Sequence, residues 1–69
     1  MNVYVFKTSV TQNDIGLIDA LLRSVIPVSI WNFDLDDCDR ILRIESKTDI
    51  TGLVRYHLQS NGFVCEELE

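Results

Sequence analysis

Hydrophobic residues recur with a period of two in some stretches of this chain and with helical spacing in others, and the order of these stretches constrains the fold. Residues 3–8, 29–35 and 40–46 are rich in β-branched and aromatic residues or alternate apolar with polar ones, which predicts strands. Residues 63–65 begin a fourth strand. Between them, two helices are predicted from apolar stripes formed by Ile15, Ile18, Leu22 and Val25 and by Ile50, Leu53, Val54 and Leu58.

The second and third predicted strands are adjacent in sequence and predict a hairpin. Residues 36–39 read Asp-Asp-Cys-Asp, and short acidic residues favour turns because they hydrogen-bond their own backbone. We expect Phe33 to face Ile44 on one side of the hairpin. The same register sets Asp34 opposite Arg43 on the other side, as a favourable cross-strand charge pair.

The predicted order is therefore strand, helix, strand, strand, helix, strand within one domain that spans residues 1–69. An α+β, ferredoxin-like βαββαβ sandwich accommodates this order economically, with a four-stranded antiparallel sheet and both helices on one face. Each strand then needs only one apolar face, which the alternation provides.

The composition of the chain limits which classes of molecule it can bind. Eleven acidic residues against six basic ones leave a formal net charge of −5, and such a surface repels phosphate groups. No apolar run approaches the roughly 18 residues of a membrane span. Two distant cysteines are too few for a disulfide framework. We therefore predict a cytoplasmic protein with free thiols, no nucleic-acid partner and no membrane association.

Three stretches of the chain resemble the heavy-metal-associated domains of copper chaperones and metal-transporting ATPases. Residues 5–8 lead into the first helix as that family's first strand does. Residues 28–35 are similar to the family's second strand, with an aspartate before the last apolar residue. Residues 53–63 are similar to the family's second helix, which ends in glycine and an aromatic residue. The resemblance implies the same fold over nearly the whole chain.

The metal-binding motif of that family is missing. Its members place Met-x-Cys-x-x-Cys between the first strand and the first helix, where two thiolates bind Cu(I). Residues 7–13 of this chain read Lys-Thr-Ser-Val-Thr-Gln-Asn. The corresponding degenerate loop thus offers only hydroxyls and an amide, from Thr8, Ser9, Thr11 and Gln12. These are poor ligands for a soft cation, so we expect no cofactor here.

A second, weaker candidate for metal binding is the acidic turn. Cys38 is surrounded in sequence by Asp36, Asp37 and Asp39, and the implied fold places this turn at the same end as the degenerate loop. Neighbouring carboxylates disfavour the negatively charged thiolate that binds Cu(I). The alternative function is a divergent copper-type carrier that uses Cys38 and these carboxylates, within one chain or across a dimer. Cys65 is expected to be a buried small hydrophobe.

Catalysis has little support in the sequence. His57 is the only histidine, it lies at the border of the second apolar stripe, and no nucleophile accompanies it. We therefore predict no catalytic residue and no enzymatic activity.

The uncovered face of the predicted sheet is the best candidate for a binding surface. We expect Tyr4, Phe6 and Ile41 to lie there beside charged residues such as Arg43, and an apolar group rimmed by charge is typical of an interface. The sequence therefore predicts a small non-enzymatic interaction module that binds another protein or a second copy of itself through this face.

Overall fold

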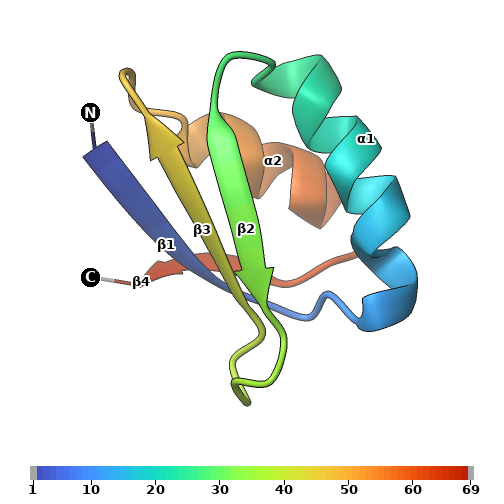
Figure 1. Cartoon of the computed structure of the whole chain (residues 1–69). Helices are drawn as coiled ribbons and strands as arrows, with labels where there is room; N and C mark the ends of the chain where they lie inside the picture. The colour runs from blue at the N-terminus through green and yellow to red at the C-terminus, as the bar shows by residue number, and fades with distance from the viewer. Residues whose placement is uncertain (1, 69) are drawn as a thin grey trace.

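The computed structural model describes residues 2–68 and contains four antiparallel strands and two α-helices (Figure 1). The elements are β1 (Asn2–Thr8), the 3-10 turn η1 (Gln12–Asp14), α1 (Ile15–Val25), β2 (Ile30–Asp34), β3 (Ile41–Ser46), α2 (Thr51–Ser60) and β4 (Cys65–Leu68). The predicted α+β class and the order of strands and helices are confirmed. Neither α-helix in residues 2–68 has the length and apolar character needed to cross a bilayer.

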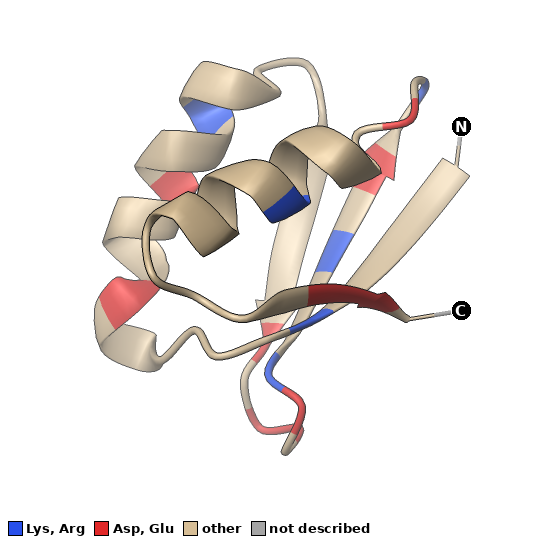
Figure 2. Cartoon of the chain, turned by 180° about the vertical axis from the view of Figure 1, so that it is seen from behind, with Lys and Arg blue, Asp and Glu red and all other residues tan. Residues whose placement is uncertain are grey.

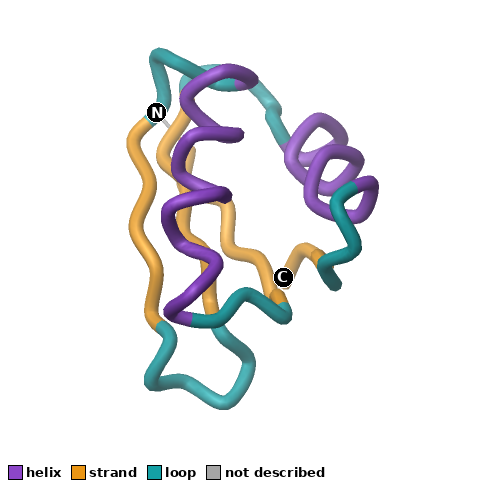
Figure 3. The backbone as a smooth tube through the Cα atoms, turned by 90° about the vertical axis from the view of Figure 1, so that its right-hand side faces the viewer, coloured by secondary structure: helices purple, strands orange, loops and turns teal. Residues whose placement is uncertain are grey.

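The four strands form one sheet in the order β2-β3-β1-β4, so β2 and β4 are its edges. Both helices lie on the same side of the sheet: they are behind it in Figure 1 and in front of it in Figure 2. In the side view both helices lie to the right of the strand at the left-hand edge, and one of them overlaps the other strands (Figure 3). The indole Nε1 of Trp31 donates a hydrogen bond to the Asp19 carboxylate (3.1 Å), which ties α1 to the β2 edge.

The core lies between the sheet and the helices. Its buried residues are Phe6, Val10, Ile18, Leu22, Ile26, Leu42, Ile44, Ile50, Val54, Leu58 and Cys65. Both predicted helical stripes contribute to this core, and so does the predicted inner face of β3. Val10 also belongs to this core, although its position in a polar loop gave no sign of it in the sequence. It lies between β1 and η1 and is fully buried.

The predicted hairpin register is wrong by two residues. Phe33 pairs with Leu42 and not with Ile44, and Arg43 lies opposite Asn32. A shift of two residues leaves every side chain on its expected face, because strand side chains alternate with a period of two. The charge pair therefore survives as a diagonal contact, with 3.9 Å between the Arg43 guanidinium and the Asp34 carboxylate.

The second helix ends where the sequence predicts. Gly62 has a positive φ of 86°, a conformation that glycine adopts without steric cost. The amide of Phe63 then donates to the carbonyl of Leu58 (3.0 Å), and the amide of Gly62 to that of Gln59 (3.0 Å). These bonds satisfy carbonyls that the helix leaves free at its end and direct the chain into β4.

Candidate functional site at the acidic turn

Three segments that are distant in sequence meet at one end of the sheet. The amide of Thr8, at the end of β1, donates to the carbonyl of Asp39 in the β2–β3 turn (3.0 Å). The next residue, Ser9, is hydrogen-bonded to Val64 in the α2–β4 connection through both its amide and its side chain. The expectation that the degenerate loop and the acidic turn share one end of the sheet is confirmed.

The hydroxyl groups of the degenerate loop are occupied by structural hydrogen bonds. Thr8 is buried, and its Oγ1 donates to the carbonyl of Arg40 (2.6 Å) while it accepts from the amide of Val10 (3.1 Å). Ser9 Oγ accepts from the amide of Val64 (2.9 Å). Gln12 is exposed at the start of η1. The loop holds the chain together at this end and presents no sulfur ligand, so its donor set does not fit Cu(I).

Thr11 and Asp14 organise the start of the helical segment. The amide and the hydroxyl of Thr11 both donate to Asp14 Oδ2, at 2.9 and 2.8 Å. These two bonds stabilise the carboxylate and lower the pKa of Asp14 below its usual value. Asp14 thus holds Thr11 in place at the entrance to α1, in the way that a capping residue does.

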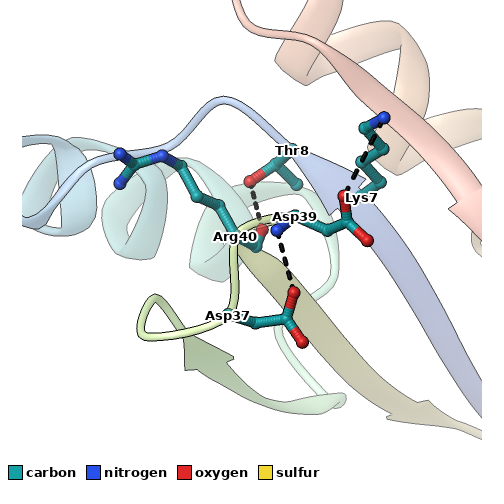
Figure 4. Close-up of polar contacts among 5 residues, drawn as sticks. All are labelled: Lys7, Thr8, Asp37, Asp39 and Arg40. Atoms are coloured by element: carbon teal, nitrogen blue, oxygen red, sulfur yellow. Dashed lines mark hydrogen bonds and ion pairs between the residues drawn. The ribbon is translucent and has the colours of Figure 1, made fainter.

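The acidic turn is shaped by its own backbone bonds (Figure 4). The side-chain carboxylate of Asp37 accepts a hydrogen bond from the amide of Asp39 (2.8 Å), and the backbone carbonyl of Asp37 accepts one from the amide of Arg40 (3.0 Å). Arg40 adopts a positive φ of 47°, which reverses the chain into β3. Lys7 lies 3.9 Å from the Asp39 carboxylate, which brings one cation to the side of the turn.

Asp37, Cys38 and Asp39 bring their ligand atoms together. One carboxylate oxygen of each aspartate and the Cys38 sulfur lie within 4.8 Å of one another. Cys38 is exposed, and Asp36, the fourth weak candidate, is exposed outside this group. Two hard oxygens and one soft sulfur on an open turn are a mixed donor set, and Lys7 competes for one of the carboxylates.

The remaining titratable candidates lie elsewhere. Cys65 is buried as predicted, and burial raises the pKa of its thiol to about 11, so it is a neutral core residue at ordinary pH. His57 lies on α2 with its ring edge-on to that of Tyr56, at a centroid distance of 5.1 Å.

The structure overturns half of the predicted interface. Phe6 is fully buried and Tyr4 packs against the core, because they pair with Leu42 and Ile44 on the side of the sheet that the helices cover. The expectation that Tyr4 and Phe6 lie on the uncovered face is therefore wrong.

The odd-numbered side chains of β1 occupy that face instead. We define the open sheet face by its apolar residues, which are Val3, Val5, Ile30, Ile41 and Leu68. Ile41 lies there as predicted but is almost completely covered, and its cross-strand neighbours are Lys7 and Asp34. Arg43 is exposed on the same face.

Comparisons of this chain with protein-family models, with curated proteins and with solved structures return no match.

Proposed function

We propose that this chain is a small, non-enzymatic protein-interaction module with the ferredoxin-like βαββαβ topology, resembling a heavy-metal-associated domain that lacks its metal-binding cysteines. The order of elements and the helices on one side of the sheet support the topology. The structural hydrogen bonds of Thr8 and Ser9 support the loss of metal binding, because each hydroxyl already has a protein partner.

The observation that carries the proposal is the open sheet face. Val3 is 59% exposed and Ile30 is 62% exposed, and both are cross-strand neighbours of Glu45 in β3. Leu68 extends the row on the other side, where it pairs with Val5. Apolar side chains from three strands thus lie exposed on one surface that no element of residues 2–68 covers. Exposed apolar side chains gathered on one face with polar groups among them are typical of a protein-binding site.

Charge on this face favours a protein partner. The face carries Lys7 and Arg43 beside Asp34, Glu45 and Glu66, so both signs are interspersed among the apolar residues. A mixed pattern provides polar contacts at the rim of an interface, and it fixes which partner surface matches.

The proposal is tested by comparing three immobilised chains in an extract of the source cells. Val3→Glu places a charge on the open sheet face, whereas Leu17→Glu places one on α1 at a similar exposure of 56%. Proteins retained by the wild type and by Leu17→Glu, and lost with Val3→Glu, support a partner on this face. Equal retention by all three chains contradicts it.

The alternative function, a divergent copper-type carrier, is favoured by one observation, the 4.8 Å cluster of Asp37, Cys38 and Asp39 ligand atoms. Its test is a titration of the reduced chain with Cu(I) against a competing chelator. One-to-one binding that is abolished by Cys38→Ser establishes the carrier and overturns the interaction module. Binding that is equally weak in both chains leaves the open sheet face as the functional surface.

A further inference from the structure

The two edges of the sheet differ in how they are protected against pairing with another strand. The edge strand β4 carries Glu66 and Glu67 among its four residues, and charged side chains on an edge discourage the addition of a further strand. The other edge strand, β2, reads Ile-Trp-Asn-Phe-Asp, contains no proline and pairs residue by residue with β3. Its second side is a row of unpaired backbone groups with little charge along it.

Side chains along β2 are incompletely buried. Trp31 and Phe33 pack against the core on the side of the helices, but both are only half-buried because nothing lies beyond the edge. Ile30 is mostly exposed on the other face, and Val28, just before the strand, is 96% exposed. Side chains on both faces of the sheet are therefore incompletely packed along β2, the edge that lacks protective charges.

We propose that β2 pairs in antiparallel register with β2 of a second copy of this chain, about a two-fold axis at Asn32. The strand is nearly symmetric about that residue, with an aromatic residue on each side of the asparagine. The axis sets Trp31 opposite Phe33 of the second copy, and Phe33 opposite its Trp31, on the side of the helices. Two aromatic cross-strand pairs then complete the packing at the edge, and aromatic pairs are among the more favourable in antiparallel sheets. The two sheets become one of eight strands.

Charge favours this antiparallel arrangement over a parallel one. Parallel pairing places Asp34 beside Asp34 of the second copy and brings the two acidic turns together. Antiparallel pairing places Asp34 of the second copy opposite Ile30, at the far end of the strand from the first chain's turn. That end borders a hollow of about 330 Å³ whose lining includes Ile30, Glu45 and Lys47, so an anion and a cation both lie there. Within residues 2–68 no ion pair involves Lys47, so its ammonium is available to offset the repulsion between Glu45 and the approaching carboxylate, whereas parallel pairing offers no such cation to the two Asp34 side chains.

The proposal goes beyond the proposed function, because it concerns the backbone edge of β2, whereas the proposed function concerns side chains across the open sheet face. The first test is a pair of opposite charges at the axis. Asn32 is exposed and lies opposite Arg43 of its own chain, which a lysine at position 32 repels and a glutamate attracts, so far-UV circular dichroism and urea unfolding first establish that Asn32→Lys and Asn32→Glu are both folded. Each substitution sets like charges directly opposite one another, which destabilises strand pairing.

Sedimentation equilibrium over a range of concentrations gives the readout. We expect the wild type to approach twice the chain mass of 7.9 kDa, and each Asn32 variant alone to stay at the mass of one chain. An equimolar mixture of the two variants regains the dimer, because a lysine then faces a glutamate. Glu66→Lys, which changes a charge on the opposite edge, leaves the dimer intact. A wild type that remains monomeric at all concentrations overturns the proposal.

A second test reads the register directly. Residues directly opposite in antiparallel strands have Cα atoms about 4.5–5.5 Å apart, within the range of roughly 4.4–6.8 Å that a disulfide spans. In a Cys38→Ser background, Asn32→Cys forms a covalent dimer under mild oxidation, and Glu66→Cys on the other edge does not. Equal cross-linking of both variants overturns the register. A dimer that is lost with Val3→Glu and kept in both Asn32 variants overturns the edge pairing and assigns the interface to the open sheet face.

Discussion

The hydroxyl of Thr8 is predicted to be one of the most important polar groups for the stability of this fold. It is buried at the end of β1, donates to the carbonyl of Arg40 (2.6 Å) and accepts from the amide of Val10 (3.1 Å). Thr8→Val keeps the shape of the side chain and removes both bonds. The amide of Val10 is then left buried without a partner, and the carbonyl of Arg40 loses its donor.

The expected cost follows from these two groups. An unsatisfied buried amide costs about 1–3 kcal/mol, and loss of the partly buried bond to Arg40 costs about 0.5–1.5 kcal/mol. The added methyl group of valine returns up to about 0.8 kcal/mol. The net loss is about 1–4 kcal/mol, and its midpoint of about 2.5 kcal/mol lowers the melting temperature of a domain this small by about 10–20 °C. Typical stabilities per residue give a 69-residue chain about 3–10 kcal/mol in total, so the loss is a large fraction.

Urea unfolding monitored by Trp31 fluorescence measures the effect. Thr51→Val is the control, because the Thr51 hydroxyl makes only solvent-exposed contacts, one of 3.5 Å with Glu67 and one with the carboxylate of Asp49, and we expect a change within about 0.5 kcal/mol. Thr8→Ser keeps the hydroxyl and is expected to lose less stability than Thr8→Val. The reasoning is refuted if Thr8→Val unfolds with the wild-type free energy, or if the serine variant is the less stable of the two.

Three further predictions concern single residues. Gly62→Ala lowers the unfolding free energy by about 1–2 kcal/mol, because alanine resists the positive φ of 86°; an unchanged urea midpoint contradicts this. At pH 8, iodoacetamide labels Cys38 in the folded chain and labels Cys65 only after denaturation, as mass spectrometry reports, because burial raises the pKa of Cys65 to about 11. Asp14 has a pKa lowered by its bonds from Thr11, so its carboxylate stabilises the fold above the unfolded pKa of about 3.8, and that contribution is lost as the pH falls through the lower folded pKa. Asp14→Asn should flatten the acid limb of the melting temperature against pH, and an unaltered limb would refute this role.

The two faces of β1 show why a strand can be predicted correctly and oriented wrongly. Val3 and Val5 on one side and Tyr4 and Phe6 on the other are all apolar, so alternation alone does not identify the inner face. The signal that decides it is Lys7, which shares a face with the two valines and whose charge is costly to bury. Burying the larger aromatic side chains also removes more apolar area from water.

The register of the β2–β3 hairpin could not be predicted from the sequence, for a different reason. A shift of two residues preserves both faces, so the hydrophobic pattern is satisfied equally by the predicted and the observed pairings. The choice depends on the turn, where Arg40 adopts a positive φ without being a glycine and Asp37 accepts two backbone hydrogen bonds. Neither feature has a sequence signature strong enough to set the length of the turn.

At the candidate site, too, the sequence predicts where segments lie but not which contacts their side chains make. The sequence placed the degenerate loop and the acidic turn at one end of the sheet, because that follows from the order of strands. It did not show what the hydroxyls of that loop do. The Thr8 hydroxyl is hydrogen-bonded to the β2–β3 turn, and the Ser9 hydroxyl to the connection into β4. These two short side chains therefore join the end of β1 to both segments through neutral hydrogen bonds. A metal site needs donor atoms that can point toward an ion, whereas the hydroxyls of Thr8 and Ser9 are already hydrogen-bonded to backbone groups. Introducing cysteines at this loop would therefore remove part of what holds the end of the sheet together, and the proposed interactions of the chain involve its open sheet face and its β2 edge instead.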